Sequence, residues 1–328
     1  MHKCVTIFAQ FHLKGFCLAS KISPQKKATI VSSSIAFLLV SIKLAAGLLG
    51  GSVAVLASAI DSLLDFLVSI FNFFAIKKAE ENPTSSFQYG KGKIQGIAAV
   101  IEGTIISLSG LFIIYKAIEK IYIGSTTELL GPSIAIMIFS IVITFFLVRY
   151  LLHVAKQTDN LVIKSDALHY QSDLWSNSVT LLALVLVWAT GQNIIDAILG
   201  LCIGIYIIYS ASEIIVDGTK ILLDHALPDD QVAAIEDILD HHPEINSYHW
   251  LKTRTDGTVN FVEFHMVLRP NMLLLEAHRI AEQVEERMMA IDPLKKWVIT
   301  PHFDPYDDEE INDALFSNGS LNGLNKEN

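Results

Sequence analysis

Six long apolar segments limit the folds open to this chain more than any other feature of its sequence. An α-helix needs about 20 consecutive apolar residues to cross the hydrocarbon core of a bilayer, and each segment meets or exceeds that length. Long apolar runs of this kind are typical of membrane proteins. We expect the spans at 30–50, 54–79, 94–122, 130–152, 168–189 and 194–216. The sequence therefore predicts a polytopic α-helical membrane protein with six transmembrane helices.

Basic residues set the orientation of these spans, because the cytoplasmic loops of membrane proteins are enriched in Lys and Arg. Such residues flank the N-terminus and the even-numbered connections, whereas the other connections are short and nearly free of them. The basic residues concerned are Lys26, Lys27, Lys77, Lys78, Lys91, Lys93, Arg149, Lys156 and Lys164. An even number of spans places both ends on one side. We therefore expect a multi-pass protein of the cell (inner) membrane, surrounded by lipid bilayer, with both termini in the cytoplasm.

Composition supports this class and excludes others. Of the 328 residues, 52% are hydrophobic and only 18% are charged, which is too apolar for an ordinary soluble domain. Residues 217–328 hold 22 of the 34 acidic residues but only 9 of the 24 basic ones, so the net charge of −10 belongs to a C-terminal soluble domain. A basic footprint for nucleic acid is absent. Cys4, Cys17 and Cys202 lack the spacing of a disulfide framework or a thiolate metal site.

Changes in composition divide the chain into four parts. Residues 1–27 contain five lysines among short apolar runs, which indicates a cytoplasmic lead-in; an amphipathic surface helix is one form of it, and a cleaved signal peptide is the alternative. Residues 28–218 make up the transmembrane domain, and residues 219–306 make up a cytoplasmic domain. Residues 307–328 are acidic and then rich in Asn, Gly and Ser, so we expect a disordered tail.

The cytoplasmic domain shows alternating helix and strand signals. The order predicted is a helix at 229–242, strands at 246–254 and 258–268 with a hairpin turn at Asp256-Gly257, a helix at 275–291 and a strand at 296–302. An αββαβ order predicts an α+β domain, in which the helices cover one face of a three-stranded sheet.

Two of the spans carry pairs of metal-capable side chains. Asp61 and Asp65 lie in the second span, and His169 and Asp173 lie in the fifth. Residues four apart share one face of a helix. An Asp at the centre of a membrane helix costs roughly 2.5–3.5 kcal/mol, so such residues face a protein interior or a watery cavity. Three carboxylates and one imidazole suit Zn²⁺ and tolerate other divalent metals. The structural alternative is that each acid caps a polar patch between helices.

Two further charged residues lie inside the spans. Lys43 is expected to reach toward the interface or to bind a partner carbonyl. Glu102 is neutral, paired with Lys43, or part of a proton route.

Histidines are also concentrated in the cytoplasmic domain. Four of them, together with one aspartate, lie within about 55 residues, which is more than packing requires: His249, His265, His278, His302 and Asp304. His302 and Asp304 are two residues apart near the last strand, so their side chains can emerge on one face. The set predicts a second metal site.

Several of these motifs occur together in one known family. They are Asp61-x-x-x-Asp65, His169-Tyr170-Gln171-Ser172-Asp173, Gly204-Ile205-Tyr206-Ile207, and the junction from Leu222-Leu223-Asp224 to Leu227-Pro228-Asp229. From about residue 30 to 305 the sequence resembles the cation diffusion facilitator family, and within it the bacterial zinc/ferrous-iron efflux pumps. The resemblance implies a homodimeric antiporter that exports a divalent metal against protons and carries a metallochaperone-like cytoplasmic domain.

The resemblance also implies roles for individual residues. By position, Asp61, Asp65, His169 and Asp173 look like the transport site. His249, His265, His278, His302 and Asp304 look like a binuclear zinc site that holds the cytoplasmic domains of the dimer together. Lys93 and Asp224 match positions that form a charge interlock between protomers near the membrane surface.

The connection between the second and third spans departs from the family pattern. Relatives carry an Asp and two His before a Gly-His-Gly-Lys run, whereas this chain has the segment from Phe87 to Lys93, with Phe87 and Lys91 at the His positions. Phe cannot bind a metal and a protonated Lys repels one, so the loop site is predicted to be missing. Glu80 and Glu81 would retain only a weak attraction for cations.

The sequence therefore favours a transporter rather than an enzyme. We expect export of a divalent cation, Zn²⁺ before Fe²⁺, Cd²⁺, Co²⁺ or Mn²⁺, in exchange for protons, with Zn²⁺ also bound structurally in the cytoplasmic domain. Protons and metal compete for the same ligand atoms, and His169 is the expected proton carrier. An intramembrane zinc hydrolase would need an open coordination position, which four protein ligands do not leave. A membrane-tethered metal sensor would not explain ligands inside the bilayer.

Overall fold

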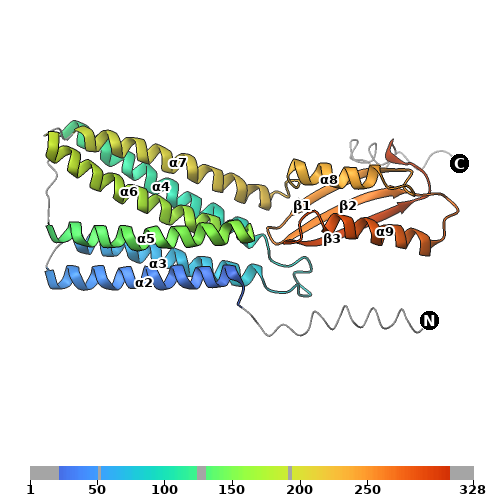
Figure 1. Cartoon of the computed structure of the whole chain (residues 1–328), viewed down its shortest axis with the longest axis horizontal. Helices are drawn as coiled ribbons and strands as arrows, with labels where there is room; N and C mark the ends of the chain where they lie inside the picture. Colours follow the sequence, from blue (N-terminus) through green and yellow to red (C-terminus); the bar gives the residue numbers. More distant parts are fainter. Residues whose placement is uncertain (1–21, 51–52, 124–130, 191–193, 311–328) are drawn as a thin grey trace.

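Six long helices form a bundle, and a smaller domain extends from one end of it (Figure 1). The computed structural model describes residues 22–50, 53–123, 131–190 and 194–310. The bundle helices are α2 (Pro24–Gly50), α3 (Val53–Ala79), α4 (Ile94–Ile123), α5 (Gly131–Thr158), α6 (Leu161–Thr190) and α7 (Ile194–Leu222).

Five of these helices, all except α6, are long and apolar enough to cross a membrane. Helix α6 has 30 residues but carries a polar first half, from Lys164 to Asp173, and it packs against α4, α5 and α7 inside the bundle. The predicted polytopic helical fold is confirmed. The fifth predicted span began at residue 168, whereas α6 begins at Leu161, because a polar helix start does not register as an apolar run.

Local capping explains where two of the helices begin. Pro24 occupies the first helical position of α2, and the Ser23 hydroxyl accepts a hydrogen bond from the Lys26 amide at 3.3 Å. The Asn160 side chain accepts a hydrogen bond from the Ile163 amide at 3.1 Å and so begins α6. Part of the predicted N-terminal lead-in, residues 24–27, thus belongs to α2, and residues 1–21 lie outside the described residues.

Helices α4 and α7 make the most extensive contact in the bundle, and glycines allow their backbones to approach closely. A Cβ atom built on Gly218 would lie 2.8 Å from the Gly96 carbonyl oxygen, and a Cβ on Gly96 would lie 2.8 Å from that of Gly218. Only glycine fits at either position without displacing the neighbouring helix.

The cytoplasmic domain has the predicted α+β architecture. It contains α8 (Asp229–Asp240), β1 (Ser247–Thr255), β2 (Val259–Val267), α9 (Leu274–Met289) and β3 (Lys296–Asp304). The sheet order is β1-β2-β3, with β1 antiparallel and β3 parallel to β2. The apolar face of the sheet packs on both helices through a core that includes Phe264, Met266, Ile235, Ile280 and Val284.

The predicted turn between β1 and β2 is present. One Asp256 carboxylate oxygen accepts hydrogen bonds from the Thr258 and Val259 amides, each at 2.8 Å, and Gly257 has a φ of +93°. A residue with this φ is strained unless it is glycine.

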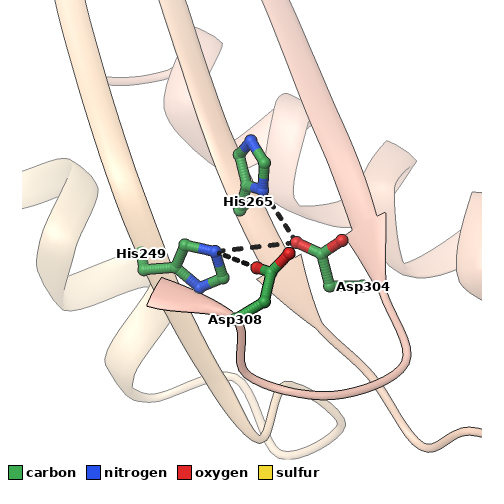
Figure 2. Close-up of side chains that lie close together, drawn as sticks. All are labelled: His249, His265, Asp304 and Asp308. Carbon is green, nitrogen blue, oxygen red and sulfur yellow. Dashed lines mark hydrogen bonds and ion pairs between the residues drawn. The ribbon is translucent and has the colours of Figure 1, made fainter. Parts of the chain in front are cut away.

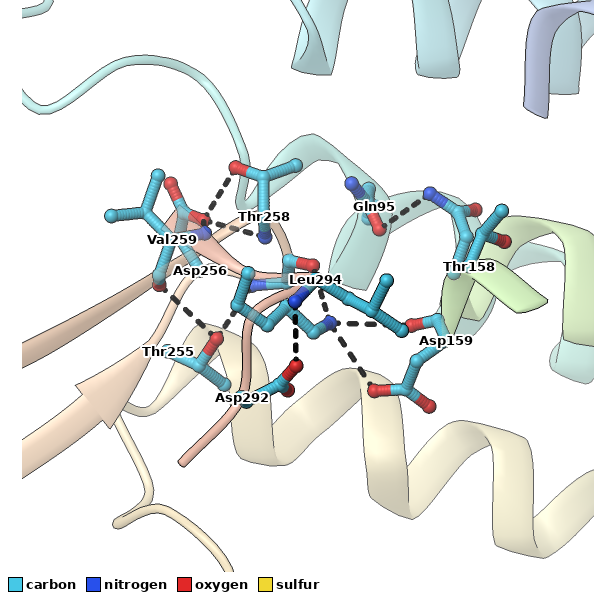
Figure 3. A network of polar contacts seen from close by, with 12 residues as sticks. Gln95, Thr158, Asp159, Thr255, Asp256, Thr258, Val259, Asp292 and Leu294 are labelled. Atoms are coloured by element: carbon cyan, nitrogen blue, oxygen red, sulfur yellow. Dashed lines mark hydrogen bonds and ion pairs between the residues drawn. The ribbon is translucent and has the colours of Figure 1, made fainter. Parts of the chain in front are cut away.

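The turn and the loop before β3 attach this domain to the bundle (Figure 3). The Lys295 ammonium lies 3.2 Å from the Asp159 carboxylate and donates to the carbonyl oxygens of Asp159, at 3.4 Å, and Gly257, at 3.1 Å. Asn160 donates to the Gln95 side chain at 3.1 Å. Lys295 therefore links the hairpin to the turn between α5 and α6, and Asn160 links that turn to the start of α4.

The first four residues of the predicted disordered tail belong to the folded domain instead. Asp307 accepts a hydrogen bond from Ser247 in β1 at 3.1 Å, and Asp308 lies 3.0 Å from His249. Their acidic composition indicated disorder, but these carboxylates have partners on the sheet. Residues 311–328 lie outside the described residues.

Candidate metal sites

The first group of metal-capable side chains lies between α3 and α6 inside the bundle. His169 Nε2 lies 3.2 Å from Asp65 Oδ1 and 3.9 Å from Asp173 Oδ2. One ligand atom from each of the three residues falls within 4.8 Å of the others, which is close enough for a single ion. The i,i+4 spacing of His169 and Asp173 puts both on the face of α6 that meets α3. His169 is buried, with 7% of its surface exposed.

Asp61, the fourth predicted ligand, is exposed and does not belong to this group in the structure. It lies one helical turn before Asp65, roughly 6 Å nearer the N-terminal end of α3. Lys43 on α2 donates to Ser62 at 2.7 Å and interacts electrostatically with Asp61, Asp65 and Asp173. Lys43 therefore does not reach toward the membrane interface as expected. Its ammonium group instead offsets the negative charge of these carboxylates.

A second polar cluster lies next to the first and was only partly anticipated. The Asn72 amide donates to Glu102 at 3.1 Å and to Asp166 at 3.2 Å, and all three residues are buried. One oxygen each of Glu102, Asp166 and Asn72 has no hydrogen-bond partner among the described residues. The sequence singled out only Glu102. Asp166 precedes His169 by three residues, and Asn72 follows Asp65 by seven, so helical periodicity could have found both.

The third cluster lies on the face of the cytoplasmic sheet that the helices do not cover. Strand pairing places His249, His265 and His302 side by side on three strands, with ring centroids 4.9 and 4.6 Å apart. A bulge at Trp250, with a φ of +59°, interrupts the ladder directly after His249. Asp304 accepts from His265 Nδ1 at 2.8 Å.

The predicted five-residue set does not assemble as a whole. The residues whose ligand atoms converge within 4.8 Å are His249, His265, Asp304 and Asp308. His302 is exposed and approaches the other Asp304 oxygen, at 3.3 Å, and His278 is exposed on α9 beside Glu282. Asp308 was missed because it lies in the acidic run after β3, where one carboxylate is not distinguished from its neighbours.

The donors of this third cluster fit a divalent metal. His249 is buried, yet neither of its ring nitrogens has a hydrogen-bond partner among the described residues. A buried polar group without a partner is costly, and a metal ion supplies a partner for an imidazole nitrogen. Two imidazoles and two carboxylates are ligands that Zn²⁺ accepts in four-coordinate sites.

Lys93 and Asp224 form an ion pair within the chain, and the charge interlock between protomers that the resemblance implied stays a prediction. Lys93 Nζ lies 2.8 Å from Asp224, and Arg254 lies 3.3 Å from its other oxygen. Partial desolvation alone would raise the pKa of Asp224, but the Lys93 hydrogen bond and the charges of Lys93 and Arg254 outweigh it and hold that pKa below its usual range. Asp224 also has a φ of +55°, in the turn that follows the end of α7 at Leu222.

The acids near the degenerate loop already have lysine partners. Glu81 pairs with Lys78 at 2.7 Å and with Lys91 at 2.8 Å, and these hydrogen bonds lower its pKa to about 2. Glu80 pairs with Lys26 at 2.8 Å. Lys91, at a position where relatives carry a His, thus pairs with Glu81, one of the two carboxylates that were expected to attract cations.

A helical membrane domain with an acid–imidazole group inside it, joined to an α+β domain with a second such group, defines a membrane transporter of cations. The chain matches the family model of the cation efflux transmembrane domain over residues 29–223 and that of the cation efflux protein cytoplasmic domain over residues 227–306. It therefore belongs to the cation diffusion facilitator family and is a cation efflux transporter, not an enzyme.

Individual relatives agree with this assignment. The chain is 34% identical over 264 residues to the cation-efflux pump FieF of Serratia proteamaculans, covering 80% of this chain and 88% of the relative. It is 34% identical over 279 residues to the FieF pump of Citrobacter koseri, covering 85% and 92%. Among solved structures, the metal-bound C-terminal domain of the CzcD transporter from Thermotoga maritima matches 23% of this chain and 87% of that chain, at 22% identity and a TM-score of 0.22.

Proposed function

We propose that this transporter exports Zn²⁺ from the cytoplasm in exchange for protons, by alternating access to a site made of Asp65, His169, Asp173 and Asp61. Fe²⁺, Cd²⁺, Co²⁺ and Mn²⁺ are the alternative substrates, because their ligand preferences overlap with those of zinc. The convergence of Asp65, His169 and Asp173 within 4.8 Å inside the bundle carries the proposal. Asp61 joins as the fourth ligand when the ion is bound.

The position of one imidazole nitrogen supports proton coupling. His169 Nε2 faces Asp65 at 3.2 Å and Asp173 at 3.9 Å, so a proton on this nitrogen lies between the same two carboxylates that bind the metal. Metal ligands must be deprotonated, so metal and proton exclude each other at this atom. Protonation from outside then releases the ion, and loss of the proton to the cytoplasm prepares the site for the next one.

The test uses purified protein in liposomes, with zinc and pH indicators inside. His169→Ala is expected to abolish proton flux driven by a zinc gradient and to reduce zinc transport strongly. His153→Ala, on the exposed face of α5, serves as the matched control and should behave as wild type. Zinc-driven proton flux that persists in His169→Ala would refute the coupling. The same assay with Fe²⁺, Cd²⁺, Co²⁺ and Mn²⁺, in wild type and Asp173→Ala, ranks the substrates.

We further propose that Glu102, with Asp166, extends the proton route from His169 toward the cytoplasmic side. Each carboxyl group is buried and keeps an oxygen without a hydrogen-bond partner among the described residues, and Asn72 bridges the two. Two anions so placed in a dry interior would be very costly, whereas a carboxyl group that accepts a proton is tolerated. The cluster can therefore receive protons that leave His169.

Glu102→Gln tests this route, because glutamine keeps the shape of the side chain but cannot exchange a proton. We expect the variant to fold and bind zinc normally, and to move fewer protons per zinc ion than wild type in the liposome assay. Glu119→Gln, at the surface end of the same helix, is the control. An unchanged proton-to-zinc ratio in Glu102→Gln would place Glu102 outside the proton path.

We also propose that the protein acts as a homodimer with both termini in the cytoplasm, and that metal held by the cytoplasmic domain strengthens the dimer. Family membership and the distribution of basic residues support this arrangement. If replacing both His265 and His302 with Ala leaves dimerisation and transport affinity unchanged, the regulatory part of this proposal fails.

A further inference from the structure

Four side chains meet at one end of the cytoplasmic sheet, as Figure 2 shows. His265 Nδ1 lies 2.8 Å from Asp304 Oδ2, and His249 Nε2 lies 3.7 Å from the same oxygen and 3.0 Å from Asp308 Oδ1. β1, β2 and β3 each supply one of these residues, and the segment that follows β3 supplies Asp308. All four therefore come from a single chain.

His249 indicates that this cluster binds a ligand. Its side chain has no exposed surface, and both ring nitrogens lack a hydrogen-bond partner within the described part of the chain. Its Nε2 atom is directed toward the carboxylates of Asp304 and Asp308 (Figure 2). Native proteins rarely leave a buried imidazole in this condition without an ion or water at the site.

We propose that Asp308 is the fourth ligand of a divalent metal bound by His249, His265 and Asp304, so that the site is complete within one protomer. The proposal rests on the cytoplasmic metal site proposed above and changes its composition. His302, which approaches Asp304 Oδ1 from the exposed side, and His278, on the surface of α9, are not ligands of this ion.

The donor set determines what the site accepts. Two imidazole nitrogens and two carboxylate oxygens satisfy a four-coordinate Zn²⁺, and the second carboxylate makes the site harder than one with three histidines. It therefore also accepts Fe²⁺, Co²⁺ and Mn²⁺, the harder ions among the candidate substrates.

Metal binding also positions residues 305–310. Without an ion, the carboxylates of Asp304 and Asp308 repel each other next to His249, which opposes the Asp307–Ser247 hydrogen bond of 3.1 Å that attaches the segment to β1. A bound cation removes this repulsion and joins β3, β1 and the segment. The metal thus fixes residues 305–310 to the end of the sheet.

Zinc binding to the full-length protein in detergent tests the assignment. Every sample carries His169→Ala/Asp173→Ala, which removes the transport site. Isothermal titration then measures the Kd of the tightest zinc-binding site that remains. Asp308→Asn should raise its Kd by about 10- to 100-fold or more, as expected for loss of a ligand. Glu310→Gln, an exposed acid of the same segment, should leave the Kd unchanged, and His302→Ala should raise it much less than Asp308→Asn does. With Co²⁺ as the probe, Asp308→Asn should also change the visible absorption that reports four-coordinate geometry.

Hydrogen exchange gives a second readout that does not depend on affinity. Zinc should protect the amides of residues 306–310 in the background protein and not in Asp308→Asn. Wild-type affinity and protection in Asp308→Asn would overturn the assignment, as would a loss in His302→Ala equal to that expected for Asp308→Asn. If the background protein bound no zinc, the cytoplasmic site itself would fail, whereas zinc transport would still be decided by the liposome assay.

Discussion

At the scale of single residues, the four proposed transport ligands do not occupy equivalent positions. Asp65, His169 and Asp173 already lie together, whereas Asp61 is exposed one turn away on α3. Lys43 contributes a positive charge to the same region. A three-ligand arrangement with a fourth ligand nearby suits a transporter, because an ion that is to be released cannot be held as tightly as a structural one.

This difference predicts unequal effects of two similar substitutions. Asp65→Asn should weaken zinc binding to the purified protein more than Asp61→Asn, because Asp65 contacts His169 at 3.2 Å and Asp61 belongs to no assembled group. Titration with zinc in a His249→Ala/His265→Ala background, which lacks both imidazoles of the cytoplasmic cluster, isolates the transport site. Equal losses of affinity in the two variants would mean that Asp61 contributes as much to zinc binding as Asp65 and would contradict this prediction.

Sequence patterns predicted the residues whose spacing repeats a motif, and missed those whose role depends on contacts across the fold. The i,i+4 pairs indicated the transport group, and the strand alternation indicated His249 and His265. Nothing in the sequence shows that Asn72 bridges Glu102 and Asp166, because the three residues lie on three different helices, α3, α4 and α6. Asp308 was hidden for the same reason, since only folding brings it to His249.

At the scale of elements, the helices were predictable in number, but their ends required local chemistry. Composition indicated the six spans. The cap at Asn160, however, starts α6 at Leu161, seven residues before the predicted start at residue 168. The sheet and both helices of the cytoplasmic domain follow from alternation and helical periodicity, with boundaries within about two residues. The close contact of α4 and α7 depends on which glycines face each other, and only the fold brings them together.

That contact gives a prediction about stability. Gly218→Ala should destabilise the protein by about 1–3 kcal/mol, because its Cβ would lie 2.8 Å from the Gly96 carbonyl oxygen and 2.9 Å from Val100. Gly200→Ala on the same helix is the matched control, since its nearest neighbour is the Ala117 Cβ at 3.4 Å. Thermal unfolding in detergent should separate the two variants. A Gly218→Ala protein as stable as Gly200→Ala would show that the helices separate easily.

At the scale of the whole molecule, several contacts among the described residues fix the cytoplasmic domain to the membrane domain. They include the Lys93–Asp224–Arg254 group, the Lys295–Asp159 pair, and an edge-to-face contact of Tyr89 with Phe261, with ring centroids 5.7 Å apart. The resemblance predicted that Lys93 and Asp224 would matter at this level. Within the chain, Lys93 also donates to the Leu222 carbonyl oxygen at the end of α7.

The lowered pKa of Asp224 predicts a dependence of stability on pH. A carboxyl group with a depressed pKa stabilises the fold above its ordinary pKa of about 4, and the contribution is lost as the pH falls through the lowered value. The difference in Tm between wild type and Asp224→Asn should therefore be largest at neutral pH and should shrink below about pH 4. Lys93→Met should lower the Tm at neutral pH, and the double variant should lose less than the sum. A difference in Tm that does not change with pH would contradict the role of this charge.

The turn between α5 and α6 connects the two domains through very few atoms. Lys295 holds Asp159, the next residue caps α6, and the imidazole of His169 follows within about three helical turns. No flexible linker lies along this path. A rotation of the cytoplasmic sheet about Lys295 would therefore tilt α6, and with it His169 and Asp173.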